Sequence, residues 1–555
     1  MDNSSLSEHF SLLSKLLDIH GENSFKSRTY SIAAYNVEQL ETPLSATPRE
    51  IIPTLRGMNG SVGQKIIEML DTGRLSALDE LLAQTPAGVI EMLQVKGLGP
   101  KKIHTIWKEM EIESLGELLY ACHENRLTRY KGFGAKTQQN IQEGIEYYLQ
   151  HQGHYLFAEM ELLFPQIDGY LKKLFGVENV AVTGSFRRHD LTMSELVFEI
   201  ISDAAAAKPK FQSAQPPELL EDTETTLLYK LKNGLKLRLN LGSAPLPARL
   251  FRSTGSEEFV KFFEEKYGLP ETTTGNDDQS IFDQAGIPFV PPFLREDLSM
   301  LSLPVEVANS PLIQVNEIRG IIHSHSTWSD GSNSIEEMAR AAISKGFEYL
   351  VISDHSKAAA YARGLSEERI REQHQEIDAL NRQLHPFRIF KSIECDILTD
   401  GSLDYADDVL AGFDLVIASI HSNLKMSEEK AMSRLLRAIS NPYVRILGHP
   451  TGRLLLSRKG YPVNHDVLIE ACAEHQVVLE INAHPRRLDL DWKWITRARD
   501  RGVLLSINPD AHSIEGYDDI RYGVLAAQKG RLTKEGNLSS MSLEAFTRFV
   551  NREKI

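Results

Sequence analysis

A chain of 555 residues is too long for one ordinary domain, and its length predicts about three to five domains. Hydrophobic residues make up 42% and charged residues 25% of it, which is typical of a soluble globular protein, and no apolar run is long enough to cross a membrane. The net charge of −15 excludes the wrapping of nucleic acid over the whole surface, because phosphate contacts need basic side chains. It leaves room for local contacts through backbone amides.

The cysteines and the first residues predict the compartment. Cys122, Cys395 and Cys472 are scattered, and they form neither a CxxC motif nor a plausible disulfide framework. The polar start Met1–Ser7 does not resemble a signal peptide. We therefore expect a cytoplasmic protein with no membrane partner, and the sequence identifies no protein partner.

The first 152 residues are predicted to be helical. The leucines between Leu12 and Leu17 follow the spacing of an amphipathic helix, which Gly21 ends, and a second helix is predicted over Arg28–Leu40. A glycine-containing pattern then occurs three times. Its copies are Leu55–Ile67, Val95–Ile103 and Tyr130–Ile141.

These three copies resemble the helix–hairpin–helix motif. Glycines let the hairpin backbone approach a phosphate closely, and the N-terminus of the following helix presents free N–H groups to the anion. The alternative is a glycine-containing connector that binds nothing. Three copies favour non-specific DNA binding, and the first, with Met58 and Asn59 in its hairpin, is the least regular. The residues expected to contact DNA are Gly57, Gly97, Gly99, Lys101, Gly132, Gly134 and Lys136.

Residues 153–245 have a different pattern. An apolar strand over Val177–Val182 leads into Thr183–Arg188, which resembles the Gly-Ser-Phe-Arg-Arg element of the family X DNA polymerases, of the nucleotidyltransferase fold. In that family the Gly-Ser pair helps to hold the incoming triphosphate. A Gly-Asp-x-Asp strand supplies two metal-binding carboxylates, and a later strand supplies a third Asp.

The sequence departs from the family at these metal-binding positions. Ser194–Val197 stands where Gly-Asp-Ile-Asp is expected, and Lys236 stands where the third Asp is expected. Two-metal catalysis needs anionic ligands, which Val197 and Lys236 do not supply. We therefore expect a polymerase-shaped module that does not polymerise. The residues of this degenerate site are Gly184, Ser185, Arg187, Glu195, Val197 and Lys236.

Residues 246–294 resemble a reduced form of the family's thumb, with a polar, poorly patterned middle at Glu271–Asp278. The proline-containing stretch Phe289–Leu294 and the weakly patterned residues 295–317 indicate a linker.

From Ile318 onward, apolar runs that end in polar residues alternate with helical intervals. Alternating strands and helices predict parallel strands joined by right-handed crossovers, with the chemistry at the carboxyl ends of the strands. The first run leads into His323. The other runs are Tyr349–Ser353, Phe387–Ile393, Leu415–Ile420, Val444–Gly448, Val477–Ile481 and Val503–Ile507.

The polar residues at the strand ends are candidate metal ligands. His323 and His325 are two residues apart, so a strand points both imidazoles to one side, and the turn through Ser329 and Gly331 returns Asp330 toward them. Imidazole and carboxylate without thiolate suit Zn, Mn or Fe. A single histidine at a strand end could simply be a buried structural residue. This interpretation does not explain why histidines and carboxylates follow most of the predicted strands.

These motifs resemble the PHP (polymerase and histidinol phosphatase) domain, and the whole chain resembles the bacterial family X DNA polymerases that carry this domain at the C-terminus. The resemblance implies nine ligands: His323, His325, Asp330, His355, Glu394, His421, His449, Asp510 and His512. Nine donors imply two or three divalent ions, Mn, Zn or Fe. Glu394 is the best candidate to bridge a pair, with a metal-bound water as the nucleophile.

The predicted fold is multidomain, with α-helical helix–hairpin–helix domains, an α+β nucleotidyltransferase-like palm and a distorted (β/α)7 PHP barrel. The predicted boundaries are 1–85 for a lyase-like domain, 86–152 for the fingers, 153–245 for the palm, 246–294 for the thumb, 295–317 for the linker and 318–555 for the PHP domain.

The resemblance implies a metal-dependent DNA phosphoesterase, foremost a 3′→5′ exonuclease that acts on gapped, nicked or 3′-end DNA in repair. An active gap-filling polymerase, a small-molecule phosphatase of the histidinol-phosphatase type and a non-catalytic DNA-end binding protein are the alternatives. Asp354 is expected to orient an imidazole, and His484 is unassigned. Loop cations that could hold DNA phosphates are Arg453, Arg458 and Arg486.

Overall fold

The computed structural model describes residues 1–40, 42–58, 60–150, 153–211, 216–243, 246–269 and 277–551. Its contacts divide the chain into two compact units, Met1–Cys122 with Tyr130–Tyr148, and His123–Arg129 with Leu149–Ile555. In the described part, no helix is both long and apolar enough to span a bilayer.

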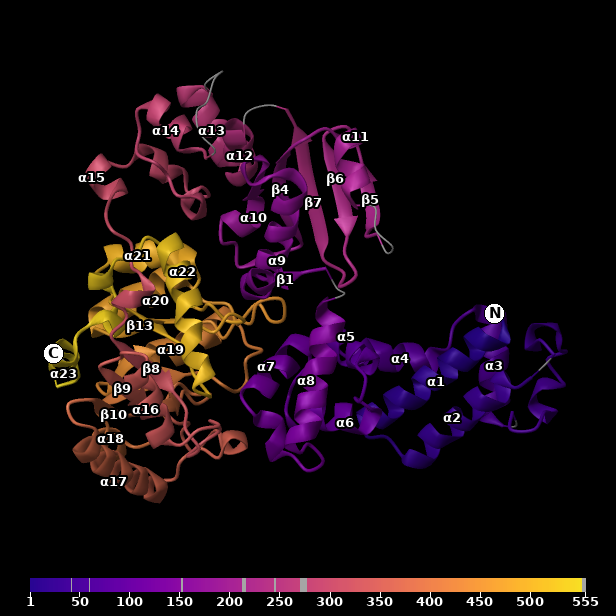
Figure 1. Ribbon diagram of the computed structural model, residues 1–555. Coiled ribbons are helices and arrows are strands. Elements are labelled where there is room, and N and C mark those ends of the chain that lie inside the picture. Colours follow the sequence, from indigo (N-terminus) through magenta and orange to yellow (C-terminus); the bar gives the residue numbers. More distant parts are fainter. Residues whose placement is uncertain are drawn as a thin grey trace. The chain divides into compact units, whose positions relative to one another are not determined.

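The first unit is helical. Helix α1 ends at Gly21, which takes the left-handed conformation (φ 74°), as the sequence predicts. Helix α2 begins earlier than predicted, because Asn23 caps it by accepting a hydrogen bond from the N–H of Phe25. The helices are α1 (Asn3–His20), α2 (Ser24–Glu38), α3 (Ser61–Thr72), α4 (Ser76–Gln84), α5 (Ala87–Glu91), α6 (Pro100–His104), α7 (Leu115–His123) and α8 (Ala135–Gln150) (Figure 1).

The second and third glycine-containing hairpins have free surfaces. Gly97 and Gly132 have φ angles of 92° and 93°, which residues with a Cβ rarely adopt. A Cβ added at either residue would meet no atom of the described residues within 4 Å, so each glycine borders open space on this side. The first hairpin differs, because a Cβ at Gly57 would lie 2.1 Å from Nδ2 of Asn36 in α2.

The second unit contains a mixed five-stranded sheet in the order β2-β4-β7-β6-β5, in which only β4 and β7 are parallel. Alternate residues of β4 and β7 are buried in one core with helix α9 (Phe157–Phe175). The other elements are β1 (Tyr155–Leu156), β2 (Val180–Thr183), α10 (Gly184–Arg187), β3 (Thr192–Met193), β4 (Glu195–Ile201), α11 (Ala204–Ala207), β5 (Glu218–Asp222), β6 (Thr226–Lys230) and β7 (Lys236–Gly242).

Three helices follow the sheet: α12 (Leu246–Thr254), α13 (Glu257–Tyr267) and α14 (Gln279–Ala285). Most of the predicted polar stretch Glu271–Asp278 lies outside the described residues. Residues 295–317, predicted as a linker, contain the short helix α15 (Val305–Ala308), and Met300 and Leu301 pack in the same apolar cluster as Phe251 of α12. This part of the stretch therefore packs against the thumb-like helices.

A nearly closed barrel of seven parallel strands completes the unit, in the order β14-β13-β12-β11-β10-β9-β8, and it confirms the predicted fold class. A bridge between Ser324 and Ala511 brings the first and last strands together. The strands are β8 (Gly320–Ser324), β9 (Tyr349–Ile352), β10 (Arg388–Asp396), β11 (Leu415–Ser419), β12 (Val444–Leu447), β13 (Val478–Asn482) and β14 (Leu505–Asn508). The helices are α16 (Ile335–Ser344), α17 (Glu367–Leu384), α18 (Asp407–Leu410), α19 (Glu428–Ile439), α20 (His465–His475), α21 (Ile495–Asp500), α22 (Ile520–Lys529) and α23 (Leu543–Val550).

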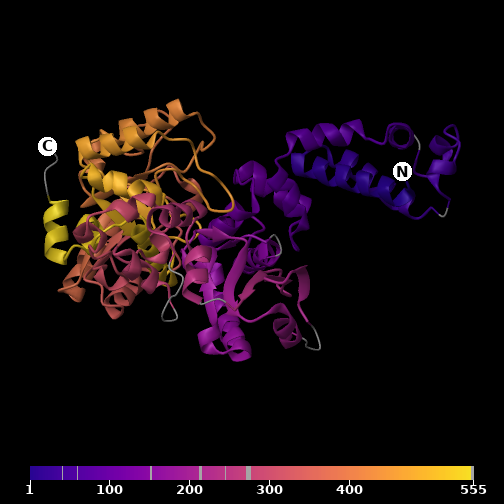
Figure 2. The ribbon, with the colours of Figure 1, turned by 90° about the horizontal axis from the view of Figure 1, so that it is seen from above.

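The barrel has an apolar core beneath its polar mouth. Ile322, Tyr349 and Phe390 point into a cluster that Phe546 of the C-terminal helix α23 completes, and the rings of Tyr349 and Phe546 stack with centroids 4.4 Å apart. Helix α23 lies at the edge of the barrel in both views (Figures 1 and 2). This apolar cluster fills the part of the barrel interior that lies away from the mouth, and the polar side chains lie at the carboxyl ends of the strands.

Candidate metal centre

Strand β8 and the loop that follows it contribute the first three predicted ligands. The rings of His323 and His325 lie side by side, with centroids 5.3 Å apart, as the two-residue spacing predicts. The loop returns Asp330, whose Oδ1 lies 3.7 Å from Nδ1 of His325. All three side chains are fully buried.

Asp354, at the end of β9, holds that loop in place. Its carboxylate accepts hydrogen bonds from the N–H and Oγ of Ser326 at 2.8 and 2.7 Å, and from the N–H of Ser329 at 3.1 Å. The amide of Gln373 in α17 donates a further bond at 2.7 Å. These bonds orient the backbone that carries Asp330, whereas the sequence predicts that Asp354 orients an imidazole.

The remaining predicted ligands come from five other strands and converge on the same place. His355 follows β9, Glu394 lies in β10, His421 follows β11 and His449 follows β12. Asp510 and His512 follow β14. Because the strands are parallel, all these carboxyl ends meet at one mouth of the barrel.

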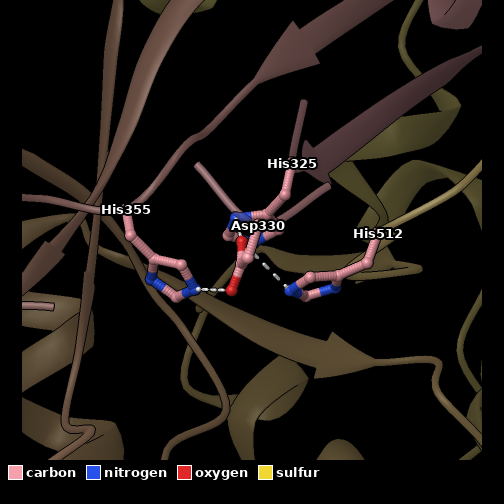
Figure 3. Close-up of side chains that lie close together, drawn as sticks. All are labelled: His325, Asp330, His355 and His512. Atoms are coloured by element: carbon pink, nitrogen blue, oxygen red, sulfur yellow. Dashed lines mark ion pairs between the residues drawn. The ribbon is translucent and has the colours of Figure 1, made fainter. Parts of the chain in front are cut away.

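Donor atoms of eight of the nine residues form three overlapping groups, within each of which they lie no more than 4.8 Å apart. The first consists of His325, Asp330, His355 and His512, and Figure 3 shows the Asp330 carboxylate between the rings of His355 and His512. Nε2 of His355 and of His512 lie 3.4 and 3.6 Å from its oxygens. The other groups are His323 with His325 and Asp510, and His355 with Glu394 and His421.

Glu394 lies at the centre of the cluster. Its Oε1 is 3.0 Å from Nε2 of His421 and 2.9 Å from Nε2 of His449, the predicted ligand that belongs to none of the three groups. Its Oε2 is 3.0 Å from Nδ1 of His355. This one carboxylate therefore faces imidazoles from three different strand ends.

The charges of the cluster are strongly coupled. Burial alone would lower the pKa of His421, but the carboxylates of Glu394 and Asp396 outweigh it and raise that pKa to about 9. In the same way, Asp330 and then Asp510 raise the pKa of His512 to about 9 against the effect of burial. Burial would raise the pKa of Glu394, yet the neighbouring histidines hold it well below its ordinary value. Protonated imidazoles thus balance the carboxylates at neutral pH, and a cation that binds must displace their protons.

The donor atoms fit divalent cations. Among the described residues, several buried nitrogen and oxygen atoms of this cluster have no hydrogen-bond partner, although an unpartnered buried polar atom is costly in a folded protein. These atoms are His323 Nε2, His325 Nδ1, Asp330 Oδ2, His355 Nδ1, His449 Nδ1 and His512 Nε2. The set contains imidazole and carboxylate but no thiolate, which suits Mn, Zn or Fe.

Two carboxylates that the sequence analysis did not select support the histidines. Glu480 in β13 lies 2.6 Å from Nδ1 of His323, and Asp396 in β10 lies 3.2 Å from Nδ1 of His421. Glu480 interrupts the apolar run Val477–Ile481, and a charge within such a run is the signal that could have identified it.

The predicted phosphate-binding arginines make contacts within the protein. Arg453 donates to the backbone oxygens of Arg487, at 3.0 Å, and Leu488. Arg458 donates to the backbone oxygen of Gly452 at 2.9 Å, and Arg486 pairs with Glu159 of α9 at 2.9 Å. The unassigned His484 accepts a hydrogen bond from the N–H of Arg486, and burial holds its pKa well below the ordinary value.

The polymerase-like residues lie near one another at the same end of the neighbouring strands β2, β4 and β7. Gly184 has a φ angle of 64°, and a Cβ there would lie 3.4 Å from Cγ2 of Val197. Glu195 of β4 stands opposite Lys236 of β7 in the strand register. Ser185 accepts a hydrogen bond from Arg188, and Arg187 makes two bonds to the buried Asp278 at 2.8 and 2.9 Å.

Models of three families match this chain: a helix-hairpin-helix domain over residues 1–75, a SAM-like helix-hairpin-helix tandem over 89–146 and a PHP domain over 322–484. The DNA polymerase/3′-5′ exonuclease PolX of Bacillus subtilis is 34% identical over 561 residues, which cover 97% of each chain. Probable phosphatases of Caldanaerobacter subterraneus and of a Thermoanaerobacter species are each 28% identical, over 34% of this chain and 74% and 77% of their own lengths. Buried clusters of His and Asp are typical of the metal site of PHP domains.

Proposed function

This chain belongs to the PolX family of bacterial DNA polymerase/3′-5′ exonucleases, and we propose that within this family it acts as a metal-dependent 3′→5′ exonuclease on gapped or nicked DNA. The convergence of nine imidazole and carboxylate side chains at one barrel mouth carries the proposal. When bound there, two or three divalent ions supply a nucleophile from water near neutral pH and offset charge on the phosphoryl oxygens.

The ligands in this proposal are the nine predicted residues. These side chains would hold the ions, and Glu394 would be the residue shared by a pair of them, since its two oxygens face His355 on one side and His421 and His449 on the other. Asp396 accepts from Nδ1 of His421, so Nε2 of His421 is the nitrogen that would coordinate an ion once its proton is displaced. Phosphodiester hydrolysis then needs no covalent nucleophile from the protein.

The helix–hairpin–helix elements hold the DNA in this proposal. The turns at Gly97 and Gly132 are uncovered, and α6 and α8 begin directly after Gly99 and Gly134, so their first N–H groups are available to a phosphate. Such contacts do not depend on sequence, and they raise the local concentration of 3′ ends at the barrel. The phosphatase alternative gives these elements no role.

We also infer that the polymerase-like module is inactive, in contrast to what the name of the Bacillus subtilis relative states for that protein. The support is chemical: Val197 and Lys236 offer no anionic ligand. Glu195 is paired with Arg238 at 2.8 Å, and the buried Glu199 is paired with Arg249. Two magnesium ions would have to displace both arginines from these carboxylates, and two carboxylates are too few to hold two ions.

One assay with purified protein and Mn²⁺ tests both proposals. A gapped duplex carries a label at the 5′ end of the primer strand, with dNTPs supplied or withheld, beside histidinol phosphate in a separate reaction. We expect shortening of the primer without dNTPs, no lengthening with them, and loss of shortening in Asp330→Asn. Lengthening in Asp330→Asn would overturn the inactive module, and phosphate release from histidinol phosphate alone would overturn the exonuclease.

A further inference from the structure

Three of the predicted ligands have backbone conformations that are rare for residues with a Cβ. The φ angles are 65° at His323, 24° at His449 and 53° at Asp510. Only a few per cent of such residues have a positive φ, and these conformations persist where surrounding contacts enforce them. The contacts at all three residues lead to the same buried side chain, Glu480.

Glu480 lies in the middle of β13 and is fully buried. Its Oε1 is 2.6 Å from Nδ1 of His323, and its Oε2 accepts a hydrogen bond from the backbone N–H of His449 at 2.7 Å. One carboxylate therefore bonds to the imidazole after one strand and to the backbone after another.

The contact with His323 determines which nitrogen of that ring can bind a cation. A carboxylate only accepts hydrogen bonds, so Nδ1 of His323 must carry the proton. In the neutral form of the ring, which is the form that can bind a cation, Nε2 is then the nitrogen without a hydrogen. It lies 3.3 Å from Oε1 of Glu394 and 3.4 Å from Oδ1 of Asp510. That nitrogen has no hydrogen-bond partner among the described residues, and it faces the donors with which it would share an ion.

Two asparagines extend the contact to Asp510. Asn508 donates to Oε1 of Glu480 at 2.8 Å and accepts a hydrogen bond from Ser506 at 2.6 Å. Asn482 lies two residues beyond Glu480 and donates to Oδ2 of Asp510 at 2.9 Å and to Oε2 of Glu480 at 3.4 Å. Oδ1 of Asp510 is thereby directed to Nε2 of His325, 3.1 Å away.

We propose that Glu480 is a positioning residue that builds the ion site of His323, His325 and Asp510 by fixing the tautomer of His323, the backbone of His449 and, through Asn482, the carboxylate of Asp510. Glu480 is not itself a ligand, because both its oxygens bond to other residues and it belongs to none of the three groups of donor atoms found among the described residues. This inference rests on the proposed metal-dependent function, since it assigns a support for the same site.

Glu480→Gln tests the proposal. The amide keeps the size of the side chain, but it can accept only one of the two bonds and turns its NH₂ toward the other donor. We expect the affinity for one class of Mn²⁺ ion to fall about 10- to 100-fold. The number of ions bound per protein at saturation should not change, and a higher concentration of Mn²⁺ should restore the exonuclease rate. Free Mn²⁺ is measured by electron paramagnetic resonance in the absence of DNA.

The matched control is Asp414→Asn. Asp414 precedes β11, at the other end of the barrel, where it accepts a hydrogen bond from the N–H of Lys391 at 2.9 Å. This variant should bind Mn²⁺ as the wild type does. A folded Glu480→Gln protein, with an unchanged unfolding midpoint without metal and wild-type affinity for every ion, would overturn the proposal.

A second variant covers the case in which Glu480→Gln does not fold. Asn482→Ala leaves Glu480 in place and removes the bond to Asp510. We therefore expect the affinity for the same class of Mn²⁺ ion to fall about tenfold, and wild-type affinity would again overturn the proposal. Because binding is measured without DNA, a wild-type protein that binds Mn²⁺ but leaves DNA intact would contradict only the proposed exonuclease.

Discussion

Arg238 donates a hydrogen bond to Glu195 over 2.8 Å, across the parallel strands β7 and β4. The same guanidinium reaches Glu221 of β5 at 3.1 Å, and these two carboxylates raise the pKa of Arg238 although burial opposes them. Glu195, at the start of strand β4, thus has a permanently charged partner from within the protein.

Breaking this pair should not produce a polymerase. In an Asp330→Asn background, Arg238→Ala frees Glu195, but a single carboxylate beside Lys236 cannot hold two magnesium ions, so we expect no dNTP incorporation. A gel assay with a 5′-labelled primer on gapped DNA measures this. Primer extension by the double variant would mean that the module needs fewer carboxylates than the two-metal argument requires.

Replacement of Glu394, the proposed bridging carboxylate, should remove nuclease activity. Glu394→Gln keeps the shape of the side chain but removes its charge, and a neutral amide bridges two cations poorly. We expect a fall in kcat of more than about 100-fold, because the ions contribute several kcal/mol to the stabilisation of the transition state. Metal content by mass spectrometry should fall in parallel. An unchanged metal content and rate would assign the bridging role to another residue.

The gathering of polar residues at one mouth of the barrel could be predicted from the sequence, because most of them follow a recognisable apolar run and parallel strands place such residues together. Their assignment as ligands comes from the resemblance to the PHP domain. The seven strands could be predicted from the same apolar runs. Asp354 shows the limit of this reasoning. The sequence identifies it as a polar residue at a strand end, but only the structure shows that it binds the loop at Ser326 and Ser329.

The supporting residues could not be predicted, because their partners are distant in the chain. Glu480 and His323 are 157 residues apart, and no local pattern joins them. The packing of Phe546 against Tyr349 in the barrel interior likewise depends on tertiary structure, since an amphipathic C-terminal helix could pack on many surfaces. The same is true of Asn36, which packs against the first hairpin at Gly57.

The loop that carries Asp330 should depend on Asp354. Asp354→Asn turns an acceptor of several hydrogen bonds into an amide whose NH₂ would oppose the N–H groups of Ser326 and Ser329. We expect a loss of about 3 kcal/mol in the stability of the barrel, since hydrogen bonds to charged groups contribute more than neutral ones. Calorimetry of the metal-free protein measures this, with Asp414→Asn as the control. A stability equal to that of the control would show that the loop is held by other contacts.

The lysines beside the uncovered hairpins should contribute to DNA affinity without sequence preference. Lys101 and Lys136 are exposed at the starts of α6 and α8. Each contact with a phosphate releases about one counterion, so Lys101→Ala and Lys136→Ala should each reduce the slope of log K against log salt by about 1. Fluorescence anisotropy with gapped DNA at several salt concentrations measures the slope. Lys15→Ala on α1 is the control, and equal slopes for all three variants would exclude these hairpins as the binding surface.

The stability of the second unit should decrease below neutral pH because of His189. Its ring packs between Phe157 and Phe293, with centroids 5.2 and 5.4 Å away, and burial, followed by the charges of Lys529 and Arg521, lowers its pKa to about 4. The unfolded chain therefore takes up the proton first as the pH falls. The stabilising contribution is complete above the ordinary pKa of 6.5 and is lost between pH 6.5 and 4, by about 3 kcal/mol in all.

His189→Asn removes this titration and suits the positive φ of 54° at this position. The variant should be less stable than the wild type at pH 7.5, because it loses the ring contacts, but its unfolding midpoint should change less between pH 7.5 and pH 5. Thermal unfolding followed by circular dichroism at both pH values measures the difference, and His475→Asn, a partly exposed site at the end of α20, is the control. Equal pH dependence in His189→Asn and the wild type would place the acid sensitivity elsewhere, since the other titrating groups are the same in both proteins.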